Sequence, residues 1–158
     1  MRHIALIPDG IRRWSRLHNV GLDHAYCAVS RVLVDISDTI FAHEADSLSV
    51  YVLSKQNLTR SSNDLALTFS SHIRIFETVL PRLAAKWNAR IIHVGDRGLL
   101  PGNYLRALDG VCDFSNPFCG RKEIYICAGY SVDWEIATFW NGNTDHEKGC
   151  KYHMRSTS

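Results

Sequence analysis

The chain has 158 residues, 46% of them hydrophobic, and 18 basic against 16 acidic residues give it a formal net charge of +2. A chain of this length buries one hydrophobic core, so we expect a single domain. The near balance of charges excludes a protein that binds nucleic acid through an extended basic surface.

Short apolar or β-branched runs alternate with helical patterns along the chain. The predicted strands are His3–Ile7, Leu48–Leu53, Arg90–Val94 and Glu123–Cys127. A helical pattern covers Asp23–Ala42, and a second begins after Ser61 and continues to Leu80, where Pro81 should kink or break it. This alternation predicts an α/β fold, a mostly parallel central sheet flanked by helices.

Neither a membrane span nor a disulfide framework is expected. No apolar run approaches the roughly 18 residues of a membrane span, and the chain enters its first strand without a signal peptide, so we predict a cytoplasmic protein. The 5 cysteines include no Cys-x-x-Cys pair and leave an odd one over. This count disfavours a set of disulfides or a zinc ribbon, and most of the cysteines should be small buried hydrophobic residues.

The first predicted strand ends on a carboxylate that two guanidinium groups soon follow. The segment reads Pro8-Asp9-Gly10-Ile11-Arg12-Arg13-Trp14. A helix that begins near Ile11 would offer free N–H groups to an anion, and Gly10 lets the backbone approach it closely. Asp9 could then hold Mg²⁺ while Arg12 and Arg13 bind phosphate oxygens. The pattern favours a diphosphate site, and the alternative is an aspartate that caps a helix beside two solvated arginines.

Four blocks of the chain together resemble the cis-prenyltransferase (undecaprenyl diphosphate synthase) family. The stretch from Asp9 to Trp14 resembles Asp-Gly-Asn-Gly-Arg-Trp, and Tyr51 to Arg60 resembles Tyr-x-Phe-Ser-x-Glu-Asn-Trp-x-Arg. Val94 to Pro101 resembles Ile-Gly-Asp-Arg-x-x-Leu-Pro, and Tyr125 to Ile136 resembles a strand that ends in Asn-Tyr-Gly-Gly-Arg-x-Glu-Ile. The resemblance implies the family's fold, a prenyl transfer reaction, Mg²⁺ as cofactor and an allylic diphosphate as substrate.

The resemblance also implies roles for single residues. Asp9, Ser54 and Asn57 would be catalytic, with Asp9 as the metal ligand. The implied substrate-binding residues are Gly10, Arg12, Arg13, Trp14, Tyr26, Leu58, Arg60 and Arg155. The alternative for Ser54, Asn57 and Arg60 is an ordinary polar loop.

Other residues are expected to shape the pocket or the loops around it. The candidate walls of an apolar pocket are Leu22, Leu53, Leu58, Phe69 and Ile73, with ordinary core packing as the alternative. The Gly95-Asp96-Arg97 segment should mainly shape a loop, and His93 should be a hydrogen-bonded core histidine. Tyr130 and Glu135 should tie a strand end to the helix that follows.

Several positions depart from the chain-elongating members of the family. The Asn of the first motif is Ile11 here, and the Arg and His that help to hold the allylic diphosphate are replaced by Leu22 and Tyr26. Here the chain resembles the branch that makes irregular C10 skeletons, such as the cyclolavandulyl diphosphate synthases. That branch joins two dimethylallyl diphosphates head to middle, which implies a lavandulyl or cyclolavandulyl type of product. Tyr26 could contact the diphosphate or cap an apolar helix face.

Two other functions stay open from the sequence. One is a chain-elongating cis-prenyltransferase that adds isopentenyl diphosphate to an allylic starter. The other is a non-catalytic homologue or partner subunit that needs a second chain.

The C-terminal part matches the family least. Residues 1–140 are predicted to form the family-like domain, and 141–158 a polar tail in place of the segment that binds isopentenyl diphosphate and builds the family's dimer. A homodimer is consequently an open expectation. Arg155 lies in a stretch that faintly resembles His-Val-Arg-x-Ser of the irregular branch. His146, Cys150 and His153 have a spacing that could bind zinc, with a frayed tail as the alternative.

Overall fold

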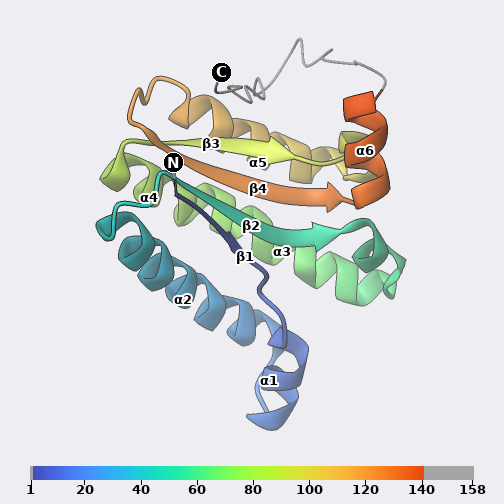
Figure 1. The fold of residues 1–158 in the computed structure, drawn as a ribbon. Helices are drawn as coiled ribbons and strands as arrows, with labels where there is room; N and C mark the ends of the chain where they lie inside the picture. The colour runs from blue at the N-terminus through green and yellow to red at the C-terminus, as the bar shows by residue number, and fades with distance from the viewer. Residues whose placement is uncertain (1, 141–158) are drawn as a thin grey trace.

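A computed structural model describes residues 2–140, in which strands and helices alternate along the chain (Figure 1). The strands are β1 (His3–Leu6), β2 (Ser47–Ser54), β3 (Ala89–Val94) and β4 (Lys122–Tyr130). The helices are α1 (Ile11–Leu17), α2 (Leu22–Ala42), α3 (Ser62–Thr78), α4 (Leu80–Trp87), α5 (Gly102–Ser115) and α6 (Val132–Trp140), with two short 3-10 segments, η1 (Lys55–Thr59) and η2 (Arg97–Leu99).

The strands form one sheet of 4 strands in the order β1-β2-β4-β3, and every neighbouring pair is parallel. This confirms the predicted α/β fold with a parallel sheet flanked by helices. Strands β2 and β4 continue beyond the apolar runs that mark them in the sequence, because Ser54 still pairs with Tyr130 at their carboxyl ends. The sheet therefore delivers both residues to the same edge.

A single hydrophobic core lies between one face of the sheet and the helices α2 to α5. Leu48 and Val50 of β2 and Ile124 and Ile126 of β4 alternate toward this face and are at most 1% exposed. The helices add Leu33, Phe41, Phe76, Leu83, Tyr104 and Leu108. Since each buried side chain of this size contributes on the order of 1.5–3 kcal/mol, the core fixes how the helices lie on the sheet.

The opposite face of the sheet carries polar side chains. Ser47 and Ser49 alternate with the core residues of β2, and the imidazole of His3 lies between them, with Nδ1 at 2.7 Å from the Ser47 Oγ and Nε2 at 3.1 Å from the Ser49 Oγ. On β4 the Tyr125 hydroxyl donates to Glu123, which also pairs with Arg90 of β3 at 3.2 Å. On the face away from the core, these side-chain bonds join β1 to β2 and β3 to β4.

Pro81 separates two helices, as the sequence predicts. Helix α3 ends at Thr78, and Pro81 lies in the first turn of α4, where its missing N–H breaks no intrahelical hydrogen bond. Asn88 then ends α4 in the left-handed region, with φ of 48°, and turns the chain into β3.

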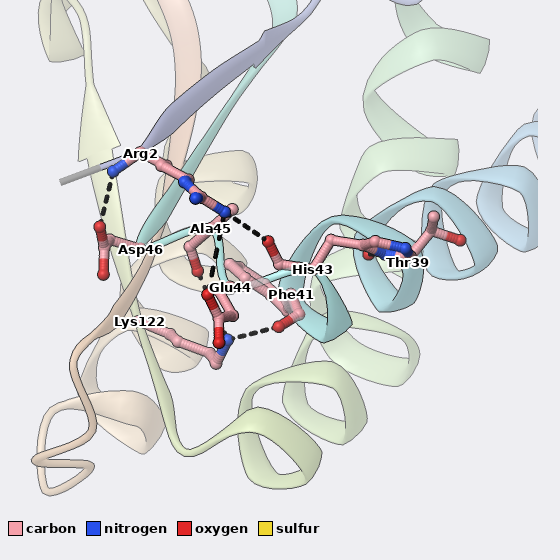
Figure 2. A network of polar contacts seen from close by, with 8 residues as sticks. All are labelled: Arg2, Thr39, Phe41, His43, Glu44, Ala45, Asp46 and Lys122. Atoms are coloured by element: carbon pink, nitrogen blue, oxygen red, sulfur yellow. Dashed lines mark hydrogen bonds and ion pairs between the residues drawn. The ribbon is translucent and has the colours of Figure 1, made fainter.

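A polar network fastens the amino ends of the strands (Figure 2). The backbone N–H of Arg2 donates to the Asp46 carboxylate at 2.6 Å, and its guanidinium reaches the His43 carbonyl oxygen at 3.4 Å. From β4, the Lys122 ammonium donates to the Phe41 carbonyl oxygen at 2.7 Å. Because these bonds join β1, β4 and the end of α2, they hold the sheet at the end opposite its carboxyl edge.

The cysteines follow the prediction in part. Cys112 and Cys127 are buried, whereas Cys27 is half-buried and Cys119 is exposed. No disulfide joins any of these four. Within residues 2–140, no helix is both long enough and apolar enough to cross a membrane.

Candidate active site

The carboxyl edge of the sheet brings together segments that are far apart in the sequence. The chain leaves β1 through Asp9 and Gly10 into α1, leaves β2 through Ser54 into η1, and leaves β4 through Tyr130 into α6. Figure 1 shows these exits at the arrowhead ends of the strands. Ligands of parallel α/β sheets commonly bind at this edge, and a substrate site here stays a prediction.

Asp9 and Gly10 form the first part of the site. Gly10 has φ of 86° and starts α1, as the sequence predicts for a helix near Ile11. The Asp9 carboxylate accepts a hydrogen bond from the Gly10 N–H at 2.6 Å and another from the Arg13 guanidinium at 3.1 Å. The Asp9 side chain is 82% exposed. Its oxygens therefore keep lone pairs that face solvent.

The residues present fit a magnesium ion held together with a substrate. Mg²⁺ in phosphate-binding sites commonly takes one or two carboxylates and completes its shell with phosphate oxygens and water. Asp9 supplies one such carboxylate. Within the described part of the chain, no group of three or more His, Cys, Asp or Glu side chains could hold a metal ion.

Arg12 and Arg13 contact different carboxylates. Arg13 pairs with Asp9 one turn earlier on the same segment, whereas the Arg12 guanidinium lies 3.9 Å from the Asp64 carboxylate at the start of α3. Both arginine side chains are more than half exposed, at 52% and 71%. Exposed pairs of this kind contribute about 0.2–1 kcal/mol, so a diphosphate can compete for both guanidinium groups. The indole of Trp14 instead stacks on His18, with ring centroids 4.4 Å apart.

The loop after β2 is held by its own side chains. The Ser54 hydroxyl accepts from the Asn57 N–H, and the Asn57 side-chain oxygen accepts from the Ser54 N–H, both at 3.2 Å. This reciprocal cap fixes the start of η1, and the Arg60 N–H donates to the Asn57 carbonyl at 3.3 Å where η1 ends. The predicted catalytic residues Ser54 and Asn57 thus shape the loop, and contact with substrate stays a prediction for both.

The candidate pocket walls divide into two groups. Leu53 is 1% exposed and belongs to the central core, which favours ordinary packing for that residue. Leu58, Phe69 and Ile73 are half-buried and pack against the same core from its margin. Leu22 is also half-buried, at the start of α2. For these partly exposed side chains, a role as walls of a substrate pocket stays a prediction.

Tyr26 points into the protein. Its side chain is 5% exposed, and its hydroxyl lies 3.1 Å from the Thr68 Oγ1 on α3. Because the Thr68 hydroxyl already donates to the Asp64 carbonyl oxygen at 2.8 Å, Tyr26 is the donor to Thr68. Of the two roles that the sequence leaves open, this placement favours packing against a helix over direct contact with the diphosphate.

A buried histidine, which no motif of the sequence marks, lies next to Tyr26. The rings of Tyr26 and His72 meet edge to face with centroids 5.5 Å apart, and the His72 Nδ1 lies 3.1 Å from the Tyr104 hydroxyl of α5. Burial, together with the positive charge of Arg60 as the smaller cause, lowers the pKa of His72 to about 4. His72 is therefore neutral. The spacing of Thr68 and His72, four residues apart on one face of α3, is the only local signal for this cluster.

The Gly95-Asp96-Arg97 segment shapes a loop, as predicted. A Cβ on Gly95 would lie 2.0 Å from the Ala128 carbonyl oxygen, and the Asp96 carboxylate accepts from the Gly98 N–H at 2.9 Å. The Arg97 guanidinium forms two bonds to the Asp109 carboxylate, at 2.9 and 2.7 Å. These contacts hold the chain after β3 against β4 and α5.

Two further predictions about the carboxyl edge agree with the structure. The Tyr130 hydroxyl donates to Glu135 at 2.5 Å and joins the end of β4 to α6, and this bond raises the pKa of Tyr130. His93 is hydrogen-bonded through its Nε2 to the Ala128 carbonyl oxygen at 2.9 Å, although it is half-buried rather than in the core. Arg155 and the possible zinc ligands His146, Cys150 and His153 lie outside the described residues.

Comparison with known proteins settles the family. The model of the family described as "Putative undecaprenyl diphosphate synthase" matches residues 7–156. The chain belongs to this family. The assignment agrees with the cis-prenyltransferase resemblance of the four sequence motifs.

Curated relatives support the assignment. The chain is 34% identical over 140 residues to a Pyrobaculum aerophilum protein named tritrans,polycis-undecaprenyl-diphosphate synthase (geranylgeranyl-diphosphate specific), with 85% of this chain and 57% of the relative covered. It is 32% identical over 141 residues to the (2Z,6E)-farnesyl diphosphate synthase of Mycobacterium tuberculosis, with 85% and 50% covered. The chain therefore spans about half the length of these relatives.

Solved structures share the fold. A lavandulyl diphosphate synthase from Lavandula x intermedia, solved in complex with dimethylallyl diphosphate, matches with a TM-score of 0.81 at 19% identity, covering 92% of this chain and 63% of the other. A probable undecaprenyl diphosphate synthase from Campylobacter jejuni matches with a TM-score of 0.64 at 17% identity, covering 89% and 62%. At these identities the likeness concerns the architecture, the parallel sheet with its flanking helices.

Proposed function

We propose that this protein is a Mg²⁺-dependent prenyltransferase that condenses two dimethylallyl diphosphates head to middle into a lavandulyl or cyclolavandulyl type of C10 diphosphate. The observation that carries the prenyl transfer is the exposed Asp9 carboxylate just before α1, with Arg12 and Arg13 in the first turn of that helix. This arrangement combines a metal ligand with two forked phosphate donors at the ligand-binding edge of the sheet.

The residues of the site have distinct tasks in such a reaction. Mg²⁺ held by Asp9 and the phosphate oxygens would stabilise the negative charge of the departing diphosphate. Arg12 and Arg13 bind the same phosphate oxygens from α1, and Arg60 adds a third guanidinium from the end of η1. Leu58 and Phe69 keep water from the allylic carbon, so that an alkene rather than water attacks it.

The choice of an irregular C10 product depends on the departures from the elongating members of the family. Leu22 and Tyr26 replace the Arg and His that help those enzymes to hold the allylic diphosphate, and Tyr26 donates its hydroxyl to Thr68 in the interior. The lavandulyl diphosphate synthase with the same fold, solved with dimethylallyl diphosphate, is in keeping with this choice.

Chain elongation with isopentenyl diphosphate is the second candidate. The names of the curated relatives at 34% and 32% identity favour it, since both refer to regular prenyl diphosphates. Our first proposal, the irregular condensation, also includes a cytoplasmic location, a homodimer and a family-like domain that ends at residue 140.

Product analysis separates the candidates. The purified protein would be incubated with Mg²⁺ and dimethylallyl diphosphate, with and without isopentenyl diphosphate, and the alcohols released by phosphatase would be identified by mass spectrometry. A C10 alcohol from dimethylallyl diphosphate alone is expected. Product that forms only when isopentenyl diphosphate is present would support elongation, and no product in either mixture would support a homologue that needs a partner chain.

A further inference from the structure

An ion pair connects the two segments that carry the proposed diphosphate site. One segment, residues 9–13, leads from β1 into α1, and the other, residues 54–60, is the loop after β2. Asp64 lies just after that loop, in the first turn of α3, and its carboxylate is 3.9 Å from the Arg12 guanidinium of α1. The pair therefore ties α1 to the helix that follows the loop.

The backbone of Asp64 is fixed independently of this ion pair. Its N–H donates to the Ser61 hydroxyl at 3.3 Å, and its carbonyl oxygen accepts from the Thr68 hydroxyl at 2.8 Å. The side chain of Asp64 is nevertheless 41% exposed. Its carboxylate can therefore turn toward solvent while the start of α3 keeps its hydrogen bonds.

Arg12 is held only weakly by this carboxylate. The guanidinium is 52% exposed, and a separation of 3.9 Å is longer than a hydrogen bond, so the two groups attract each other by charge alone. Arg12 is anchored at its backbone, because its carbonyl oxygen accepts a hydrogen bond from the Arg16 side chain at 3.3 Å. The guanidinium can therefore exchange Asp64 for another anion without movement of α1.

A diphosphate is such an anion. Its oxygens match the forked donors of a guanidinium, and it carries more negative charge than one carboxylate. A carboxylate and a diphosphate on the same guanidinium would repel each other. Arg12 consequently has two alternative partners, Asp64 in the empty site and the diphosphate in the loaded site.

We propose that Asp64 is an internal competitor of the diphosphate, which holds Arg12 while the site is empty and is displaced when the ligand binds. The inference rests on the proposed function and adds a residue that lowers the affinity of the same site. It also implies that the tie between α1 and α3 exists in the empty protein and is released in the loaded one.

Binding of inorganic diphosphate tests the competition without turnover. NMR titration of the intact protein with Mg²⁺ and diphosphate, at low ionic strength where exposed charges are screened least, would compare the wild type with Asp64→Asn. The variant should bind about two- to fivefold more tightly, the factor expected when an exposed ion pair no longer has to be broken. Equal affinity would overturn the competition, and weaker binding by the variant would mean that Asp64 supports the ligand.

Two controls separate the ion pair from a general effect of charge. Asp23→Asn removes the same charge from the first turn of α2 and should change the affinity less than Asp64→Asn does. In an Arg12→Ala background, Asp64→Asn should no longer tighten binding, and NMR titration still measures the millimolar dissociation constants expected there. A gain that Asp23→Asn reproduces, or that persists without Arg12, would overturn the proposal.

A second ligand distinguishes failure of this inference from failure of the proposed function. In dimethylallyl thiodiphosphate, sulfur replaces the bridging oxygen and slows ionisation. Asp64→Asn should tighten its binding by the same factor, because the competition concerns only the diphosphate group. Binding of inorganic diphosphate but not of this analogue would contradict prenyl transfer and leave the competition standing. Absence of binding by both ligands would overturn the proposed function and the competition together.

Discussion

Mild acid should destabilise this protein through His72. The folded-state pKa of His72 is about 4 because of burial, whereas the ordinary value of 6.5 applies in the unfolded chain. A depressed pKa means that the unfolded state binds more protons between these values, so stability is complete above pH 6.5 and is lost as the pH falls toward 4. The whole shift corresponds to about 3 kcal/mol, of which about 2 kcal/mol is already lost at about pH 5.

Urea unfolding at about pH 7.5 and about pH 5 measures this loss. The matched variant is His72→Gln, which keeps a polar side chain near the Tyr104 hydroxyl but does not titrate. All other groups contribute nearly equally to both proteins, so the wild type should lose about 2 kcal/mol more than the variant over this interval. Equal losses of unfolding free energy in the wild type and the His72→Gln variant would refute the role given to His72.

Three further substitutions test other parts of the structure. Asp9→Ala should abolish product formation without changing the melting temperature, because the side chain is 82% exposed; near-normal turnover would contradict its role as metal ligand. Arg13→Ala should lower kcat/KM by about 10²-fold, or about 3 kcal/mol, whereas Arg16→Ala on the same helix should have little effect. Equal losses in the two variants would mean that Arg13 contributes only to the general positive charge of the surface and does not bind the diphosphate directly. Gly95→Ala should destabilise the fold by at least about 2 kcal/mol, because its Cβ would lie 2.0 Å from a backbone oxygen at φ of 141°. Gly110→Ala, with no atom within 4 Å of its Cβ, is the control, and similar melting temperatures for the two variants would refute the steric argument.

Local patterns in the sequence predict most of the framework. The alternation of apolar runs identifies all the strands of the sheet, Pro81 marks the break between α3 and α4, and Gly10 marks the start of α1. Each of these signals depends on a few adjacent residues: β-branched side chains favour strands, proline lacks a donor, and glycine permits a positive φ. The carboxyl-edge position of Asp9 then follows from the parallel sheet.

The buried cluster of Tyr26, Thr68, His72 and Tyr104 could not be predicted in this way. In the sequence, Tyr26 only fits the pattern of an amphipathic helix. Its hydrogen bond to Thr68 joins residues that are 42 positions apart. The bond between His72 and Tyr104 depends on how α3 and α5 pack, which no local pattern encodes. In the same way, the pairing of Arg12 with Asp64 becomes visible only when α1 and α3 are placed together.

Titration with dimethylallyl thiodiphosphate, in the presence and absence of Mg²⁺, tests most directly whether the carboxyl edge is the diphosphate site. The account predicts saturable binding that Mg²⁺ strengthens, that Asp9→Ala abolishes, and that Asp113→Ala on the exposed surface of α5 leaves intact. Binding that is equal in the wild type and the Asp9→Ala variant, or that does not respond to Mg²⁺, would contradict it.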